Sequence, residues 1–297
     1  MPCTSPLVTS IHRVDGRFSL KSILGVGSHA IVCLAQNIIS DEEVAVKLES
    51  FTGHLSESPL EREFVALTNL QGGFGIPQPI WFGRESSYQA LVLDSIATPL
   101  CDIVASQGGL LSLNSVLSIS CQLVSRLEYI HLRHYIHCDI KPQNVLLHQS
   151  DSRHATTVFL IDFSVALQYC DPATRIHIPY QEGCPFVGTP AFSSISHHCR
   201  YQSGCRDDIE SLTYTLVYLL RGSLPWFSDV NTSLSSNVIC NLKRDTTVET
   251  LCDGLPVEFV TFIKYSHSLA YGARPDYDYL KKLLEDCIVQ PVCFYLT

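Results

Sequence analysis

Charged residues are scarce in this sequence, and Cys-x-x-Cys pairs are missing. Only 16% of the 297 residues are charged, and 20 Lys and Arg against 29 Asp and Glu give a formal net charge of −9. This acidic balance excludes nucleic-acid binding through bulk positive charge, although it leaves room for a local basic patch. The 13 cysteines are odd in number and scattered. That pattern favours reduced thiols in the cytosol or nucleus over the disulfide framework of a secreted domain.

Long apolar runs are missing as well. The nearest candidate, 212–220, is too short to span a bilayer. The first residues lack a basic region followed by an apolar stretch, which predicts no secretory signal. Cys293 lies one residue too far from the end for a prenylation box. We therefore expect no membrane insertion and a cytoplasmic location, with the nucleus as an additional compartment.

Hydrophobic residues, in contrast, are plentiful. They make up 46% of the chain, which is enough for a large core and the opposite of a disordered composition. The length suggests one large domain or two lobes. We find no internal repeat, low-complexity tract or long linker, so we expect a single compact unit.

The hydrophobic pattern changes along the chain. Alternation of apolar and polar residues predicts a strand over 44–49, and 89–93 is a second short apolar strand. Helical spacing predicts a helix over 59–70, ended by two glycines. Beyond Ser112, which suits an N-cap, the spacing is that of an amphipathic helix, and 208–220 is apolar almost all round. The sequence thus predicts a small strand-rich part and a larger helical part, joined near 94–98.

Gly25 and Gly27 lie between two predicted strands. A Gly-x-Gly pair in a hairpin is most often only a turn. The alternative is a phosphate contact, because glycines let backbone amides approach phosphate oxygens without a Cβ in the way. A strand rather than a helix follows, which disfavours a dinucleotide-binding turn.

Lys47 lies in the middle of the 44–49 strand and has two interpretations. A lysine between apolar strand residues ordinarily faces solvent. The glycines that precede it and Glu63 on the next predicted helix favour the second interpretation, an ion pair that holds the ammonium against a phosphate.

The stretch 137–147, followed by 159–164, carries the most specific signal. We expect Asp139, Lys141 and Asn144 to converge in one turn, and Asp162 follows a predicted buried strand. This grouping is typical of phosphoryl transfer, which needs a carboxylate to orient a hydroxyl and a cation for the γ-phosphate. An amide and a second carboxylate then hold Mg²⁺.

With these residues the chain resembles the protein kinases, and specifically the casein kinase 1 family. The similarity covers about 14–285. The family replaces the usual Ala-Pro-Glu motif with Ser-Ile-Asn, and this chain has Ser194-Ile195-Ser196. Other family-like stretches are Glu42-Glu43-Val44-Ala45-Val46-Lys47-Leu48-Glu49, Gln71-Gly72-Gly73-Phe74-Gly75-Ile76-Pro77, Arg126-Leu127-Glu128-Tyr129-Ile130-His131, Arg206-Asp207-Asp208-Ile209-Glu210-Ser211-Leu212, Gly222-Ser223-Leu224-Pro225-Trp226 and Arg274-Pro275-Asp276-Tyr277-Asp278-Tyr279-Leu280.

The resemblance implies an α+β, bilobal protein-kinase-like fold. A small β-rich N-lobe would carry one main helix, and the C-lobe would be larger and mostly helical. The implied division is an N-terminal extension over 1–13, the N-lobe over 14–93, the hinge over 94–98, the C-lobe over 99–287 and a short tail over 288–297.

The resemblance also implies the site residues of a monomeric protein serine/threonine kinase that uses ATP and Mg²⁺ on protein substrates. Asp139 would be the catalytic base, Lys141 would stabilise the γ-phosphate, and Asn144 and Asp162 would hold Mg²⁺. Asp208 would tie its helix to the catalytic loop, and Thr189 would neighbour Asp139. The implied ATP-binding residues are Leu24, Gly25, Gly27, Val32, Ala45, Lys47 paired with Glu63, Leu93 as the gatekeeper, and Leu146.

The chain departs from the family at several positions. Cys138 replaces the Arg that usually neutralises a phosphorylated activation loop, so we predict activity without such phosphorylation. Ser164 and Ala30 replace glycines, and each adds a Cβ that could lower turnover. Ala191 replaces an Arg, and 227–232 carries no cation, which predicts a weakened preference for substrates with upstream phosphates.

Three alternatives stay open or are disfavoured. A pseudokinase that binds partners or nucleotide without catalysis is the main alternative, suggested by the departures above. A small-molecule kinase is disfavoured by the Gly-Thr-Pro motif at 188–190. Zinc binding by the stripe of His131, His134 and His137 is disfavoured because no fourth ligand is evident. The resemblance implies that a second group falls in a loop where such residues are incidental: His197, His198, Cys199 and Cys205.

Overall fold

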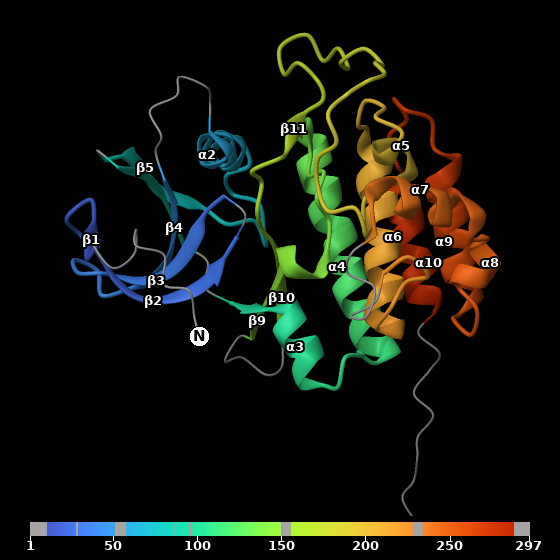
Figure 1. The fold of residues 1–297 in the computed structure, drawn as a ribbon, viewed down its shortest axis with the longest axis horizontal. Helices are drawn as coiled ribbons and strands as arrows, with labels where there is room; N and C mark the ends of the chain where they lie inside the picture. Colours follow the sequence, from blue (N-terminus) through green and yellow to red (C-terminus); the bar gives the residue numbers. More distant parts are fainter. Residues whose placement is uncertain are drawn as a thin grey trace, which may run out of the picture.

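The computed structural model describes residues 11–27, 29–50, 58–85, 87–94, 97–149, 156–227 and 234–287. They form two lobes, a curled sheet with one helix on the left of Figure 1 and a larger set of helices on the right. The predicted α+β bilobal fold is thereby confirmed. Residues 1–10 of the predicted extension, Ser95 and Ile96 of the predicted hinge, and the tail 288–297 lie outside the described residues.

The N-terminal lobe is built on an antiparallel sheet with the strand order β1-β2-β3-β4-β6-β5. The strands are β1 (Arg13–Val14), β2 (Phe18–Val26), β3 (Ile31–Asn37), β4 (Glu43–Ser50), β5 (Pro79–Arg84) and β6 (Tyr88–Leu93). Helix α2 (Pro59–Asn69) lies beside this sheet and ends one residue before the predicted helix does. Its start follows from local chemistry, because the Ser58 side chain accepts a hydrogen bond from the Glu61 amide at 3.1 Å.

Both faces of β4 are covered. Its residues Val44, Val46 and Leu48 pack into an apolar cluster within the N-terminal lobe. Ala45 faces the other way, into the main core cluster. The alternation predicted for this strand is therefore confirmed, but its second face borders the space between the lobes rather than bulk water.

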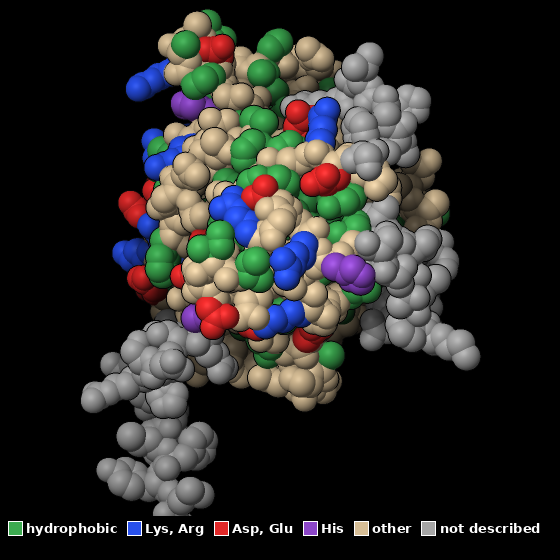
Figure 2. Space-filling view, turned by 90° about the vertical axis from the view of Figure 1, so that its left-hand side faces the viewer, with side chains coloured by type: hydrophobic (Ala, Val, Ile, Leu, Met, Phe, Trp, Pro, Cys, Tyr) green, Lys and Arg blue, Asp and Glu red, His purple; other side chains and the backbone are tan. Residues whose placement is uncertain are grey.

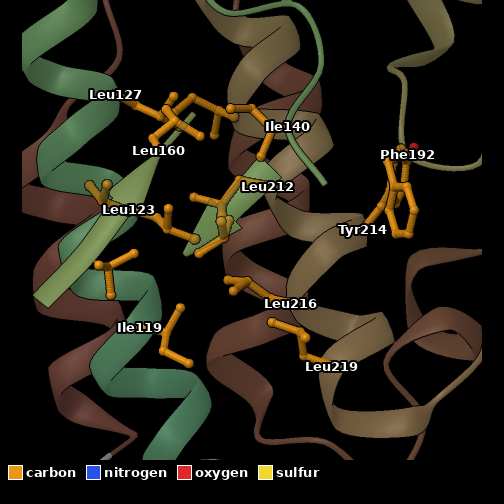
Figure 3. Close-up of a cluster of buried hydrophobic side chains, with 14 of the residues drawn as sticks. Ile119, Leu123, Leu127, Ile140, Leu160, Phe192, Leu212, Tyr214, Leu216 and Leu219 are labelled. Carbon is orange, nitrogen blue, oxygen red and sulfur yellow. The ribbon is translucent and has the colours of Figure 1, made fainter. Parts of the chain in front are cut away.

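The C-terminal lobe is organised around two helices. Helix α4 (Leu113–Leu132) begins after Ser112, whose side chain accepts from the Ser115 amide at 3.2 Å, as predicted. Helix α6 (Cys205–Arg221) starts three residues earlier than the prediction. The reason is a cap at Gly204, whose amide donates to the Asp207 carboxylate at 2.7 Å. Figure 3 shows the apolar side chains of α4 and α6 meeting in one core.

The remaining elements surround these helices and carry the connecting loops. Strands β7, β9 and β10 form one small sheet, and β8 pairs with β11. These strands are β7 (Thr98–Pro99), β8 (Tyr135–Ile136), β9 (Val145–Gln149), β10 (Thr156–Leu160) and β11 (Leu167–Gln168). The helices are α3 (Leu100–Ser106), the short turn η1 (Pro142–Asn144), α5 (Ile195–His198), α7 (Ser236–Asp245), α8 (Val248–Leu251), α9 (Val257–Ser268) and α10 (Tyr277–Asp286).

The cysteines and the surface agree with the composition. Every cysteine in the described part of the chain is a free thiol. Cys240 and Cys252 are buried, whereas Cys121 is partly exposed. Figure 2 shows basic and acidic side chains interspersed over the face of the N-terminal lobe.

None of the helices in the described ranges is both long and apolar enough to cross a membrane.

Candidate active site

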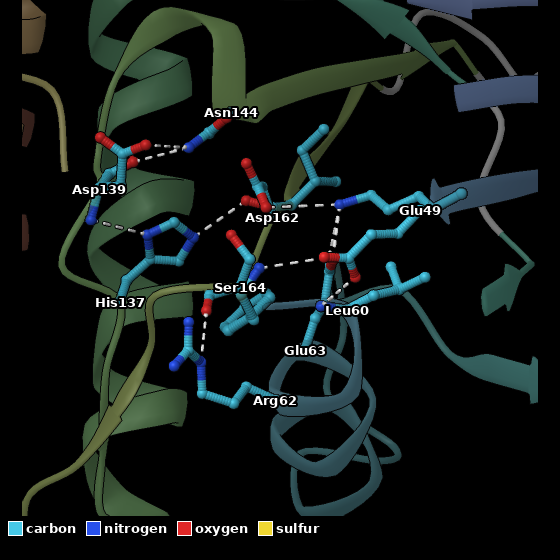
Figure 4. Close-up of polar contacts among 12 residues, drawn as sticks. Glu49, Leu60, Arg62, Glu63, His137, Asp139, Asn144, Asp162 and Ser164 are labelled. Atoms are coloured by element: carbon cyan, nitrogen blue, oxygen red, sulfur yellow. Dashed lines mark hydrogen bonds and ion pairs between the residues drawn. The ribbon is translucent and has the colours of Figure 1, made fainter. Parts of the chain in front are cut away.

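Two lobes contribute to one polar cluster, which Figure 4 shows in close-up. Lys47 comes from β4, Glu63 from α2, and Asp162 from the loop after β10. The Lys47 Nζ lies 2.7 Å and 2.8 Å from the two Glu63 carboxylate oxygens and 3.5 Å from the Asp162 Oδ1. Glu63 reaches this position because it lies on the buried face of α2, together with Leu60 and Leu67.

Lys47 is not a solvated strand lysine, so the first of its two interpretations is wrong. The residue is only 8% exposed. Burial disfavours its charged form, but the neighbouring Glu63 and Asp162 carboxylates outweigh burial and raise the pKa of Lys47. The site therefore holds a fixed positive charge between the lobes.

Asp162 is held in its ionised form. Its backbone is left-handed, with φ of 67°. Burial opposes ionisation, but the Lys47 ammonium and a hydrogen bond from the Ser164 side chain outweigh burial and lower the pKa of Asp162 to about 2. The next residue is fixed as well, since the Phe163 amide donates to Glu63 at 3.3 Å.

Asp139 lies in the turn between β8 and η1. Its Oδ2 is 2.7 Å from the Lys141 Nζ and accepts from the Asn144 amide nitrogen at 3.2 Å. The Asn144 side chain also donates to the Asp139 backbone oxygen at 2.9 Å. Asp139 Oδ1 is buried and has no hydrogen-bond partner. A buried acceptor without a partner is unusual in a folded protein, and it suits a group that receives a donor from a bound molecule.

The turn that carries Asp139 is anchored by Asp208 on α6. Its two carboxylate oxygens accept from the backbone amides of His137 at 2.7 Å and Cys138 at 2.9 Å. It also contacts His131 Nε2 at 2.9 Å. The prediction that Asp208 ties its helix to the catalytic loop is confirmed.

The loop 188–193 closes the other side of Asp139. Lys141 Nζ donates to the Thr189 hydroxyl at 2.8 Å, so Thr189 lies next to the Asp139–Lys141 pair, as predicted. Gly188 has φ of +84°, and a Cβ there would collide with the Cys138 carbonyl oxygen. Only glycine fits this approach without strain.

Two cavities meet at Val32 and Lys47. The larger, about 300 Å³, lies between the lobes and contains most of the residues expected around a nucleotide. Those residues are Leu24, Gly25, Val32, Ala45, Lys47, Leu93 and Leu146. The structure places Gly27 instead in the adjoining cavity of about 100 Å³, with Glu63 and Asp162. The apolar cavity thus continues into the charged cluster.

Sequence reasoning missed several residues of the site. Asp102 on α3 and Gln143 in η1 line the larger cavity, as do Pro77, Ala97, Pro99 and Ile161. His137 accepts from the Asp139 amide at 3.2 Å through Nδ1 and contacts the Ile161 oxygen at 3.0 Å through Nε2. The motif contains His137, but its spacing gives no sign that the ring joins the turn that carries Asp139 to Ile161, the residue before Asp162.

Asn144 and Asp162 form a donor set that fits Mg²⁺. A carboxylate and an amide oxygen are the hard oxygen ligands this ion prefers. The lowered pKa keeps Asp162 charged, and Asn144 uses its amide nitrogen on Asp139, which leaves its side-chain oxygen for a cation. When bound, the ion would neutralise charge on nucleotide phosphates.

The segment 164–187, which we call the activation segment, is held by backbone hydrogen bonds. Its outer part forms an antiparallel bridge between Glu182 and Tyr201. The Gln202 amide donates to the Gln181 oxygen at 2.9 Å beside that bridge. Cys138, which replaces the expected Arg, is 3% exposed and packs beneath the segment with φ of 67°.

A comparison with family models agrees with this geometry. The model of the protein kinase domain matches residues 18–290. The match spans both lobes and every candidate site residue described above. The chain therefore belongs to the protein kinase family.

Proposed function

We propose that this kinase is a casein kinase 1-like protein serine/threonine kinase that transfers the γ-phosphoryl group of ATP to Ser or Thr hydroxyls. The observation that carries the proposal is the unpartnered Asp139 Oδ1 beside the Lys141–Thr189 hydrogen bond. A substrate hydroxyl would supply the missing donor. Lys141, two residues after the catalytic acid, is typical of serine/threonine rather than tyrosine specificity in the family that the sequence resembles.

Each charged group would then have one task. Asp139 accepts the hydrogen bond of the attacking hydroxyl and orients it. Lys141, 2.7 Å from Asp139, offsets charge on the transferring phosphoryl group. Lys47, fixed by Glu63, contacts the α- and β-phosphates. Magnesium held by Asn144 and Asp162 would offset further negative charge on the phosphates.

The alternative of a pseudokinase is disfavoured by what surrounds the atypical residues. Ser164 hydrogen-bonds to Asp162 and supports its ionised form. The backbone amide of Cys138 donates to Asp208, a contact that does not depend on the Cys138 side chain. Neither residue removes a catalytic group, and the ion pair of Lys47 and Glu63 is intact.

Substrate choice follows from a missing cation. Ala191 is 4% exposed and offers no donor where the family that the sequence resembles carries an Arg. The stretch 227–232, which carries no cation, lies outside the described residues beyond Phe227. A phosphate upstream of the target serine would find no charge-assisted hydrogen bond at position 191. We therefore propose a weak dependence on primed substrates.

The test is radiolabel transfer from ATP to casein and to a peptide library with and without upstream phosphates. The wild type is expected to label serine and threonine peptides of both kinds. Asp139→Asn is expected to lower labelling at least about 100-fold, because general-base groups contribute roughly 10²–10⁴-fold, while ATP still binds. Equal background from both proteins would favour the pseudokinase. Strong selection for phosphoserine would contradict the substrate proposal alone.

A further inference from the structure

Lys243 on α7 is a lysine buried beneath the loop 188–193. It is 4% exposed. Its Nζ donates to the Pro190 oxygen at 2.9 Å and to the Ser193 oxygen. The Nζ also lies 4.6 Å from the ring centre of Tyr214 and 5.3 Å from that of Trp226. Backbone carbonyls and aromatic faces thus surround this ammonium group.

A buried ammonium of this kind opposes folding. Burial lowers the pKa of Lys243 to about 7, and the Glu210 carboxylate only partly offsets that effect. Glu210 is already engaged, since its Oε1 accepts from the Ile195 amide and the Tyr214 hydroxyl. An apolar side chain of similar volume would avoid the cost of burying a charge. We therefore explain the presence of a lysine at this buried position by its hydrogen bonds to two backbone carbonyls, and not by a contribution to the free energy of folding.

Those contacts hold one end of a network in which hydrogen bonds and the backbone of the loop connect Lys243 to Lys141. The Pro190 oxygen accepts from Lys243 and also contacts His198 Nε2 at 3.0 Å. The adjacent Thr189 receives the amides of Phe192 and Ser193 on its backbone oxygen, both at 3.0 Å. At the other end, the Thr189 hydroxyl accepts from Lys141.

We propose that Lys243 is a positioning residue that holds the loop 188–193 where a substrate hydroxyl can reach Asp139. The proposal rests on the proposed function. Lys243 lines neither of the two cavities expected to hold the nucleotide. Its loss should therefore impair the use of peptide while ATP binding stays unchanged.

The first test compares Lys243→Met with Lys264→Met. Lys264 on α9 is an exposed lysine that pairs with Glu249 at 2.7 Å, so its variant is a control for loss of a positive charge. We expect Lys243→Met to lower kcat/KM for peptide at least about tenfold, with KM and Kd for ATP within twofold of wild type. Unchanged peptide kinetics would overturn the proposal.

The second test is independent of catalysis. Hydrogen exchange at the Phe192 and Ser193 amides should be faster in Lys243→Met, while the His137 and Cys138 amides, held by Asp208, keep their protection. If each of the four amides exchanged at the same rate in Lys243→Met as in the wild type, the positioning role would be overturned. If the wild type labels no peptide, the proposed function fails, and this exchange measurement alone decides the role of Lys243.

A third variant covers the case in which Lys243→Met loses ATP binding through unfolding. Lys243→Arg keeps the charge but spreads its donors over a rigid planar fork. It is expected to lower kcat/KM for peptide less than Lys243→Met does, while KM and Kd for ATP again stay close to the wild-type values. Peptide kinetics identical to wild type in a folded, ATP-binding Lys243→Arg would count against the proposal.

Discussion

Single side chains fix the electrostatics of the space between the lobes. Lys47 and Glu63 are both almost completely buried, and each satisfies the charge of the other. Removing one partner from a buried ion pair leaves an uncompensated charge, which is strongly destabilising. Removing both charges together costs much less.

Lys47→Met is therefore expected to lower the free energy of unfolding by about 3 kcal/mol, in the range typical of a broken buried pair. Adding Glu63→Gln should recover part of that loss. Urea denaturation of the two single variants and the double variant measures the coupling. A double variant as unstable as the sum of the single variants would show that the pair contributes nothing as a unit.

The sequence was most informative where the chemistry is local. Asp139, Lys141 and Asn144 lie within one turn, so their spacing alone predicts that they converge. The partners of Asp208 could not be read in this way, because their contacts join segments far apart in the chain. Lys243 looks like an ordinary residue of an amphipathic helix, and only the packing of α7 against the loop 188–193 reveals its environment.

At the level of elements, Gly75 joins the two lobes. It follows α2, and its oxygen accepts from the Leu160 amide at 2.9 Å. Its φ is +72°, and a Cβ there would collide with the Arg126 side chain and the Val158 oxygen. The stretch around Gly75 is one of those that resemble the casein kinase 1 family. The steric reason for a glycine here, however, lies in α4 and β10, which carry Arg126 and Val158.

Gly75→Ala should destabilise the protein more than Gly72→Ala does. Gly72 has a similar φ of +79° but open space around the position of a Cβ. Gly72→Ala is expected to cost about 1 kcal/mol of backbone strain. Gly75→Ala should cost roughly 2 kcal/mol more, because a close-packed site resists an added carbon. Thermal unfolding of both variants measures the two losses of stability. Equal losses would contradict the role of packing around Gly75.

The activation segment makes a prediction at the same scale. Since backbone hydrogen bonds hold it and Cys138 offers no cation to a phosphate, its order should not require phosphorylation. Treatment of the purified kinase with a phosphatase is expected to leave kcat within about twofold. Loss of activity after treatment, restored by incubation with ATP, would show that a phosphate is needed.

Across the whole molecule, His131 links α4 to two other helices. Its Nε2 contacts Asp208 of α6 at 2.9 Å, and its Nδ1 contacts the Tyr277 hydroxyl of α10 at 2.6 Å. Burial opposes the charge on His131, but contacts with Cys205 and Asp208 outweigh it and raise the pKa of His131 to about 10. The folded protein therefore binds a proton here that the unfolded chain releases near pH 6.5.

This linkage predicts how stability depends on pH. Because the pKa is raised on folding, the contribution of His131 is fully present below pH 6.5 and is lost as pH rises towards 10, by at most about 1.4 kcal/mol per pH unit. Lys243, with its lowered pKa, contributes a slope of opposite sign above pH 7. The comparison is therefore between variants. The free energy of unfolding of His131→Gln should fall less steeply than that of the wild type between pH 6.5 and 8.5. The free energy of unfolding of His148→Gln, a variant of an exposed histidine, should follow that of the wild type. Identical slopes for all three would contradict the linkage.

The bridge between Glu182 and Tyr201 has a consequence for the cell as well as for the fold. We expect a kinase whose activation segment is held by its own backbone hydrogen bonds to need no activating phosphate. We expect its output to follow the number of copies made and destroyed, so that doubling the dose of protein doubles the flux of phosphate it delivers.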